Sequence, residues 1–261
     1  MEHSVKLNET IDRLTIPYKN IFTTVYLVRC GRENILFDAA SYDSDIDEYV
    51  LPWLKELRVT ELRYVFISHN HTDHAGGLGR LMAAFPDAVI VSRSKELREK
   101  FKDCRFLFPE DGDVLTGTLQ IVTLPGHSMD SMTLYDKQSK IMLTGDSLQL
   151  LGIFGADFWG ANISYPVCHL QALEKLRRME VEELLWAHDY HPMGRGAKGE
   201  KTVFDAIDAC AAPLLQVRSL IAEHPELDDE AIRSLYNVPG IPMMGCHVVT
   251  AIRRAMQQGE L

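Results

Sequence analysis

The stretch from Ser68 to Gly77, S-H-N-H-T-D-H-A-G-G, carries most of the chemistry that can be recognised in this chain. It places three imidazoles and one carboxylate at His69, His71, Asp73 and His74. In a loop, the first two side chains can converge on one cation while the last two turn toward a second. Imidazole nitrogen and carboxylate oxygen are the ligands that Zn²⁺ takes in catalytic sites. The chain has only 10 histidines, so an ordinary polar loop explains this clustering poorly.

The same arrangement, an apolar strand followed by His or Asp, recurs along the chain. Tyr64 to Ile67 reads as a strand that ends at the motif, and His127, Asp146 and His188 follow the predicted strands 119–124, 141–143 and 183–187. Rigid scaffolds present chemistry on loops at strand ends. We therefore expect these polar residues to form one site.

Further strands are predicted at 22–28, 35–37 and 88–91. Helices are predicted at 45–57, where Asp45 is a candidate N-cap, and at 76–85, 94–101 and 166–179. Gly194 to Thr202 resembles a phosphate-binding loop, but Glu200 stands where the motif requires Lys, so we interpret it as a flexible linker. Three helices, at 202–223, 228–236 and 247–258, follow it. We expect a catalytic domain over 1–197 and a helical extension over 198–261.

Composition narrows the range of partners. The 261 residues carry 27 Lys and Arg against 37 Asp and Glu, a formal net charge of −10, which disfavours nucleic acids and anionic membranes. Five dispersed cysteines without a C-x-x-C pair fit reduced thiols. The first ten residues contain no apolar signal region. We expect a cytoplasmic protein with a small-molecule substrate.

The pattern H-x-H-x-D-H followed by Gly-Gly resembles the signature of the metallo-β-lactamase superfamily, and the resemblance covers roughly residues 15 to 195. In the same order along the chain, Asp38, His127, Asp146 and His188 resemble that family's other motifs. The resemblance implies an α/β fold, a four-layer αβ/βα sandwich, here with a small helical C-terminal extension.

The resemblance also implies two divalent metal ions, zinc by preference, with iron or manganese as alternatives. His69, His71 and His127 would hold the first ion, Asp73, His74 and His188 the second, and Asp146 would bridge them. Asp73 would also take part in catalysis, and Asp38 would support a ligating histidine from behind. His188 is preferred to His191 because it falls at the end of the predicted strand. Tyr165 and Tyr190 are either phenols that polarise a substrate or residues at the edge of the core.

The leading functional hypothesis is hydrolysis of a small ester, thioester or lactone by a metal-bridging hydroxide. The alternatives are a small-molecule phosphodiesterase, a mono-iron sulfur dioxygenase and a metal-binding scaffold. His71 argues against the oxygen-reducing di-iron branch, and only 42 positions separate Asp146 from His188, too few for the inserted domain of the nucleic-acid branches. No convincing basic set for a glutathione thioester is found. Two further features each leave two interpretations open. The aromatic residues Phe154, Phe158 and Trp159 either line a pocket or belong to the core. The C-terminal segment either caps the site or forms a homodimer contact.

Overall fold

The computed structural model describes residues 3–237 and 239–261, and the chain forms two compact units. The first comprises the described residues up to Thr123 together with Met132–Gln138. The second comprises Leu124–Ser131 and Ser139–Leu261.

A seven-stranded mixed sheet, in the order β1 to β7, forms the centre of the first unit. Its strands are β1 (Ser4–Lys6), β2 (Ile11–Tyr18), β3 (Ile21–Cys30), β4 (Glu33–Phe37), β5 (Tyr64–Phe66), β6 (Val89–Val91) and β7 (Phe106–Leu107). β1 to β4 pair antiparallel, and β4 to β7 pair parallel. The turns flanking β3 are short, and Lys19 and Gly31 adopt the positive φ that tight hairpins require.

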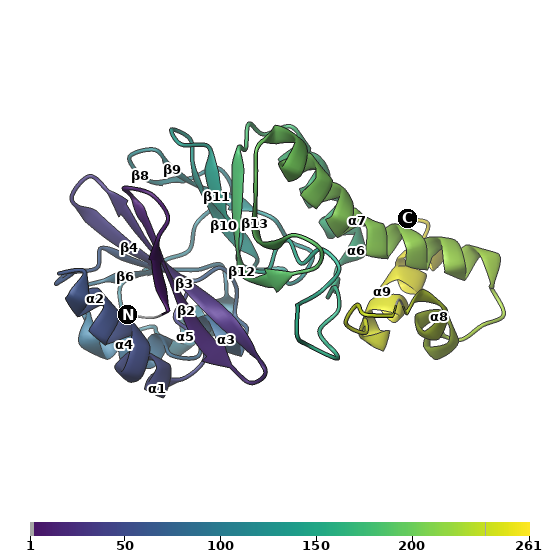
Figure 1. Ribbon diagram of the computed structural model, residues 1–261, viewed down its shortest axis with the longest axis horizontal. Helices are drawn as coiled ribbons and strands as arrows, with labels where there is room; N and C mark the ends of the chain where they lie inside the picture. Colours follow the sequence, from purple (N-terminus) through teal and green to yellow (C-terminus); the bar gives the residue numbers. More distant parts are fainter. Residues whose placement is uncertain (1–2, 238) are drawn as a thin grey trace. The chain divides into compact units, whose positions relative to one another are not determined.

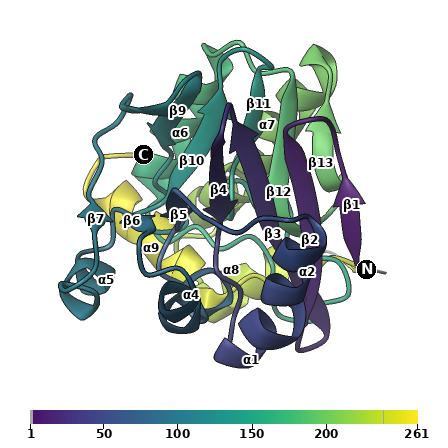
Figure 2. The same cartoon turned by 90° about the vertical axis from the view of Figure 1, so that its left-hand side faces the viewer.

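Helices pack on one face of this sheet. They are α1 (Asp43–Asp45), a π-helical turn (Ile46–Val50), α2 (Leu51–Glu56), α3 (Thr72–Ala75), α4 (Leu78–Ala84) and α5 (Lys95–Lys100). α1, α2 and α4 lie together in front of the strands in Figure 2. Their fully buried Trp53, Leu78 and Leu81 share one core with Leu27 and Val65 of the sheet. Burying this apolar face is the main source of stability for such a layered unit.

The prediction of Asp45 as N-cap is wrong. The first helix begins at Asp43 with Tyr42 as its N-cap, and Asp45 lies inside the first turn. The Asp45 carboxylate accepts hydrogen bonds from the backbone N–H groups of Ser41 and Tyr42, each at 3.0 Å. An acid that reaches back from the third helical position accepts hydrogen bonds from N–H groups before the helix much as a cap residue does, and sequence alone does not distinguish the two.

A three-stranded antiparallel meander completes the first unit: β8 (Val114–Thr116), β9 (Leu119–Thr123) and β10 (Met132–Asp136). The second unit contains β11 (Ile141–Leu143), β12 (Glu183–Tyr190) and β13 (Gly194–Lys198), with helix α6 (Pro166–Arg177) between the first two. β11 pairs parallel with β12, and β12 pairs antiparallel with β13.

The expected flexible linker after Gly194 is instead the strand β13. Gly196 lies opposite Leu185, and a Cβ on Gly196 would fall 2.6 Å from the carbonyl oxygen of Leu184. Glycine therefore serves close strand pairing at this position rather than flexibility. The predicted boundary between Ala197 and Lys198 falls inside β13, and the division into 1–197 and 198–261 stays a prediction.

The C-terminal extension is helical, as expected. The long α7 (Glu200–Glu223) packs against α8 (Asp229–Tyr236) and α9 (Cys246–Gln257), as Figure 1 shows. Val217, Ile232, Val248, Val249 and Ile252 are fully buried in the core that these helices share. Among the described residues, no helix is long and apolar enough to cross a membrane.

Candidate metal centre

Two neighbouring parallel strands bring Asp38 and Ser68 together in the first unit. Phe37 at the end of β4 pairs with Phe66 at the end of β5, so the next residues of both strands emerge at the same edge of the sheet. The Asp38 carboxylate accepts hydrogen bonds from the backbone N–H of Ser68 at 2.8 Å and from its hydroxyl at 3.0 Å. This pairing fixes the start of the histidine motif.

Asp38 also holds His74. The Nδ1–H of His74 donates to Oδ2 of Asp38 at 2.7 Å, and both side chains are fully buried. Burial raises the pKa of the Asp38 carboxyl, while the contacts with His74 and Ser68 lower it. A proton on Nδ1 leaves Nε2 with the lone pair, which is the state of a metal-ligating imidazole. The supporting role expected for Asp38 is therefore present in the geometry.

The glycine pair after the motif permits a close approach of two backbone segments. The backbone N–H groups of Gly76 and Gly77 donate to the carbonyls of Ala40 and Ala39, each at 3.1 Å. A Cβ on Gly76 would lie 1.8 Å from the carbonyl oxygen of Ser41. Any larger residue would push the ligand-bearing turn away from the Asp38 loop.

Part of the motif is helical, although the sequence analysis placed all of it in a loop. Asp73 and His74 belong to α3, with His71 as the extended N-cap residue. Nε2 of buried His69 lies 3.0 Å from Nδ1 of exposed His71, a separation at which both nitrogens can address one cation. Oδ2 of Asp73 lies 3.7 Å from Nε2 of His74. The spacing predicted that His69 pairs with His71 and that Asp73 pairs with His74, and the side chains of each pair lie close together in the structure.

In the second unit, two of the three predicted ligands lie close to the third, the carboxylate of Asp146. Asp146 follows closely on the end of β11, and its Oδ2 lies 3.8 Å from Nε2 of His127. Its Oδ1 lies 3.5 Å from Nε2 of His188. All three of these side chains are buried.

Two neighbours orient this carboxylate. The hydroxyl of fully buried Tyr190 donates to Oδ1 of Asp146 at 2.7 Å, and Nε2 of Gln149 donates to Oδ2 at 2.9 Å. Tyr190 thus lies in the interior and holds a candidate ligand, whereas Tyr165 is exposed. Gln149 was missed by the sequence analysis, because a glutamine three residues after an aspartate carries no distinctive signal.

The backbone of Asn162 orients His127. Its carbonyl accepts the Nδ1–H of His127 at 3.2 Å, which again leaves Nε2 as the lone-pair nitrogen. His188 lies within β12 rather than at its end, at a register irregularity between Leu185 and Tyr190. His191 is outside the strand and half-buried, and the centroid of its ring lies 3.5 Å from the centroid of the Phe154 ring.

The donor set suits divalent metal ions. It consists of imidazoles and carboxylates, which accept Zn²⁺, Fe²⁺ and Mn²⁺ alike, and hydrogen bonds to Nδ1 leave Nε2 of His74 and His127 ready to coordinate. The ligand atoms of Asp73 and His74 lie within 4.8 Å of each other, as do those of Asp146 and His188. Residue type, tautomer and clustering therefore agree with a metal-binding role for each unit's residues.

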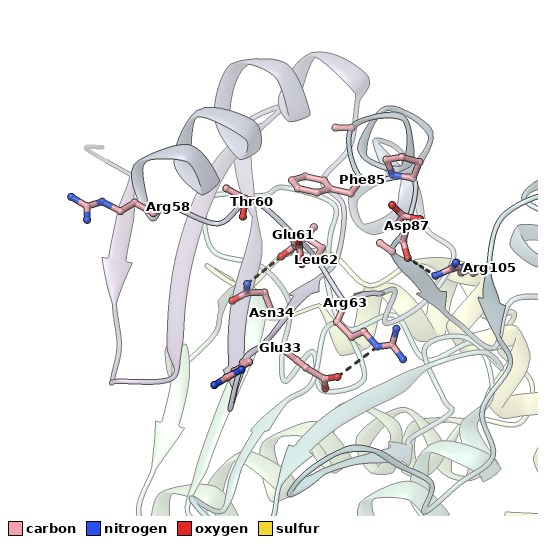
Figure 3. A pocket seen from close by; sticks show the side chains of 14 residues that line it. Glu33, Asn34, Arg58, Thr60, Glu61, Leu62, Arg63, Phe85, Asp87 and Arg105 are labelled. Atoms are coloured by element: carbon pink, nitrogen blue, oxygen red, sulfur yellow. Dashed lines mark hydrogen bonds and ion pairs between the residues drawn. The ribbon is translucent and has the colours of Figure 1, made fainter.

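A groove in the first unit lies at the opposite edge of the sheet, where β5 and β6 begin (Figure 3). It encloses about 560 Å³. Arg63 lies 3.6 Å from Glu33, and Arg105 donates to the carbonyl of Asp87. The charged lining residues alternate in sign: Arg32, Glu33, Arg58, Glu61, Arg63, Asp87 and Arg105. This mixture of charges forms no concentrated basic site.

The sequence model of the metallo-β-lactamase superfamily matches residues 19–188, a span that contains all seven candidate ligands. The chain belongs to this superfamily. The predicted superfamily and the predicted fold class are confirmed.

Similar proteins include a hydroxyacylglutathione hydrolase from Bartonella henselae, 32% identical over 132 residues that cover 49% of this chain and 49% of the relative. An atrochrysone carboxyl ACP thioesterase from Aspergillus terreus is 26% identical over 55% of this chain and 48% of its own length. The chain spans about half the length of these curated relatives.

A solved metallo-β-lactamase family protein from Thermus thermophilus matches with a TM-score of 0.70 at 16% identity. The match covers 97% of this chain and 95% of that chain. At this identity the likeness shows the fold alone.

Proposed function

We propose that the protein is a metal-dependent hydrolase that cleaves a small thioester, ester or lactone, with the thioester as the favoured substrate class. The family match over all seven His and Asp positions carries this proposal. Two relatives support the thioester by their names, one a hydroxyacylglutathione hydrolase and the other an acyl-carrier-protein thioesterase.

In this proposal the seven residues hold two divalent ions, most simply zinc. His69, His71 and His127 would hold one ion, Asp73, His74 and His188 would hold the other, and Asp146 would contribute to both. A bound metal pair supplies a water nucleophile at neutral pH and positive charge for the developing oxyanion.

The protein's own residues would orient the metal ligands and accept the proton of the attacking water. Asp38 and Asn162 accept hydrogen bonds from Nδ1–H of His74 and His127, so that Nε2 of each ring keeps the lone pair that a metal ion would take. Half-buried Asp73 has a carboxylate that, besides holding metal, would orient the attacking water and accept its proton. Tyr190 and Gln149 prevent Asp146 from rotating.

The aromatic loop that contains Phe154 and Phe158 in the second unit is the reason for proposing an apolar acyl group on the substrate. Phe154 and Phe158 are 40% and 74% exposed, so they are not core residues. The backbone N–H of Phe154 donates to the carbonyl of Asp189, next to His188, at 2.7 Å, which anchors the loop beside the strand that carries a candidate ligand. Exposed aromatic rings of this kind provide apolar contact area for a substrate.

The proposal also covers the cellular location, the partners and the oligomeric state of the enzyme. All five cysteines, each within the described residues, are free thiols, which suits the reducing cytoplasm. The net charge of −10 disfavours nucleic acids and anionic membranes as partners. Self-association into a homodimer is part of the proposal and is measurable by light scattering.

The test is metal content per chain followed by a substrate panel of acyl thioesters, aryl esters, lactones and aryl phosphodiesters. We expect two equivalents of zinc or manganese, and hydrolysis of thioesters that disappears on chelation and in Asp146→Asn. Hydrolysis that persists in metal-free protein would exclude the proposal. One iron per chain with thiol-dependent oxygen uptake would replace it with a dioxygenase, and turnover of phosphodiesters alone would replace it with a phosphodiesterase.

A further inference from the structure

A segment just before α9 is bonded to the loop that follows β11 in the same unit. The backbone N–H of Met243 donates to the carbonyl of Asp157 at 3.0 Å, and that of Gly160 donates to the carbonyl of Met243 at 3.2 Å. A Cβ on Gly160 would lie 2.6 Å from the carbonyl oxygen of Pro242. The C-terminal extension therefore touches the loop backbone directly, and only glycine permits that approach.

His247 adds a side-chain bond to this contact. It is the second residue of α9, and its Nε2–H donates to Oδ1 of Asn162 at 2.8 Å. The hydroxyl of Ser164 donates to the same oxygen at 3.2 Å. Asn162 thus has its side chain held from two sides.

The helix that carries His247 is itself anchored. Val248 and Val249, the next two residues, are fully buried in the core of the helical extension. At the next turns, Thr250 and Arg253 both donate to the carboxylate of Asp229 at 2.6 Å. His247 is therefore attached to a rigid element rather than to a loose tail.

Beyond its side chain, Asn162 contacts the neighbours of two candidate ligands through its backbone. Its carbonyl accepts the Nδ1–H of His127, and its N–H donates to Oε1 of Gln149 at 2.9 Å. Gln149 in turn donates to Asp146. One residue of the loop therefore determines the orientation of both an imidazole and the shared carboxylate.

We propose that His247 is a positioning residue for the metal centre: through Asn162 it fixes the ring of His127 and the Gln149–Asp146 pair. This inference rests on the proposed function insofar as His127 and Asp146 are metal ligands. It makes the C-terminal extension part of the metal site, where the sequence suggested only a cap or a dimer contact. Partners that orient metal ligands typically change metal affinity or activity by about 10- to 100-fold. Because His247 acts one residue further away, we expect an effect of about 10-fold.

The experiment compares His247→Ala with His247→Gln and with His224→Ala, which removes a half-buried histidine from the same extension as a control. Zinc affinity is measured by competition with a chromophoric chelator, together with kcat, KM and thermal unfolding of metal-free protein. We expect zinc affinity and kcat to fall about 10-fold in His247→Ala, with KM changed less. The Gln variant should recover most of the loss, because its amide can donate to Asn162.

Asn162→Ala and the double variant complete the test. Asn162→Ala keeps both backbone bonds but removes the acceptor of the His247 proton, so its effect should match that of His247→Ala and should not add to it. Wild-type zinc affinity and kcat in His247→Ala, or additive losses in the double variant, would overturn the inference while leaving the hydrolase intact. Absence of metal binding by the wild-type protein would overturn both proposals together.

Discussion

Replacing Tyr190 by Phe removes one hydroxyl and little else, and it tests whether the orientation of Asp146 supports metal binding. The Tyr190 hydroxyl donates to Oδ1 of Asp146 at 2.7 Å, and both side chains are buried. Without that donor, the carboxylate keeps the hydrogen bond from Gln149 but gains freedom to rotate. We expect weaker metal binding with little change in the fold.

The expected loss of metal affinity follows from the type of hydrogen bond that Tyr190 makes, which is one to a charged carboxylate. A hydrogen bond to a charged group is worth about 1.5–3 kcal/mol, and each 1.4 kcal/mol is a factor of ten at 25 °C. If the whole of that loss falls on the metal-bound state, metal affinity drops by about 10- to 150-fold. The bond from Gln149 persists, so the lower part of this range is expected.

The assay is competition for zinc with a chromophoric chelator, with thermal unfolding of the metal-free protein alongside. Tyr236→Phe is the matched control: Tyr236 is buried in the core of the same unit, and within the described part of the chain its hydroxyl has no hydrogen bond. Burial raises the pKa of Tyr236 to about 12. Equal zinc affinity in both variants, together with loss of zinc in Asp146→Asn, would refute the idea that Tyr190 orients the ligand.

Three further predictions concern single residues. Asp38→Asn tolerates the backbone φ of 66° but removes the charge that holds Nδ1–H of His74, so zinc affinity should fall by about 10-fold or more, and an unchanged chelator titration would contradict this. Burial raises the pKa of Cys210 to about 12, so iodoacetamide at pH 8 should leave Cys210 unmodified in peptide mass spectra until urea unfolds the protein; labelling at the same rate without urea would count against it. Asp228→Ala removes the N-cap bond to Ala231 and should lower the free energy of unfolding in urea by about 0.5–2 kcal/mol, whereas a loss of zinc affinity would show an unexpected link to the metal centre.

Most strands and helices follow local patterns and could be predicted. β3 and β5 are β-branched or aromatic runs, and α5 lies within the helix predicted over 94–101, with Ser94 as its N-cap. β13 was missed because glycine-rich sequence has weak strand propensity, and its extended form comes from pairing with β12. The strand propensity of a segment is a weak guide to its structure where pairing with a neighbouring strand determines its conformation.

The residues of the site also differ in whether the sequence alone indicates them. The seven candidate ligands were recognised because they follow apolar strands and because the set resembles the motifs of the superfamily, and both features can be seen in the sequence. Gln149 and Asn162 were not, since an amide near an aspartate or a backbone carbonyl gives no local signal. His247 was assigned no role, although folding places it 2.8 Å from an atom 85 positions earlier in the chain.

The family, the residue types available for metal and the order in which strands present them could all be established before folding was considered. Which nitrogen of each imidazole is free to coordinate depends instead on the folded chain. The proton on Nδ1 of His74 is held by Asp38, and that on His127 by Asn162, partners 36 and 35 positions away. A tautomer depends on the hydrogen-bond partner that the folded chain places beside the ring, and no pattern of neighbouring residues contains that information.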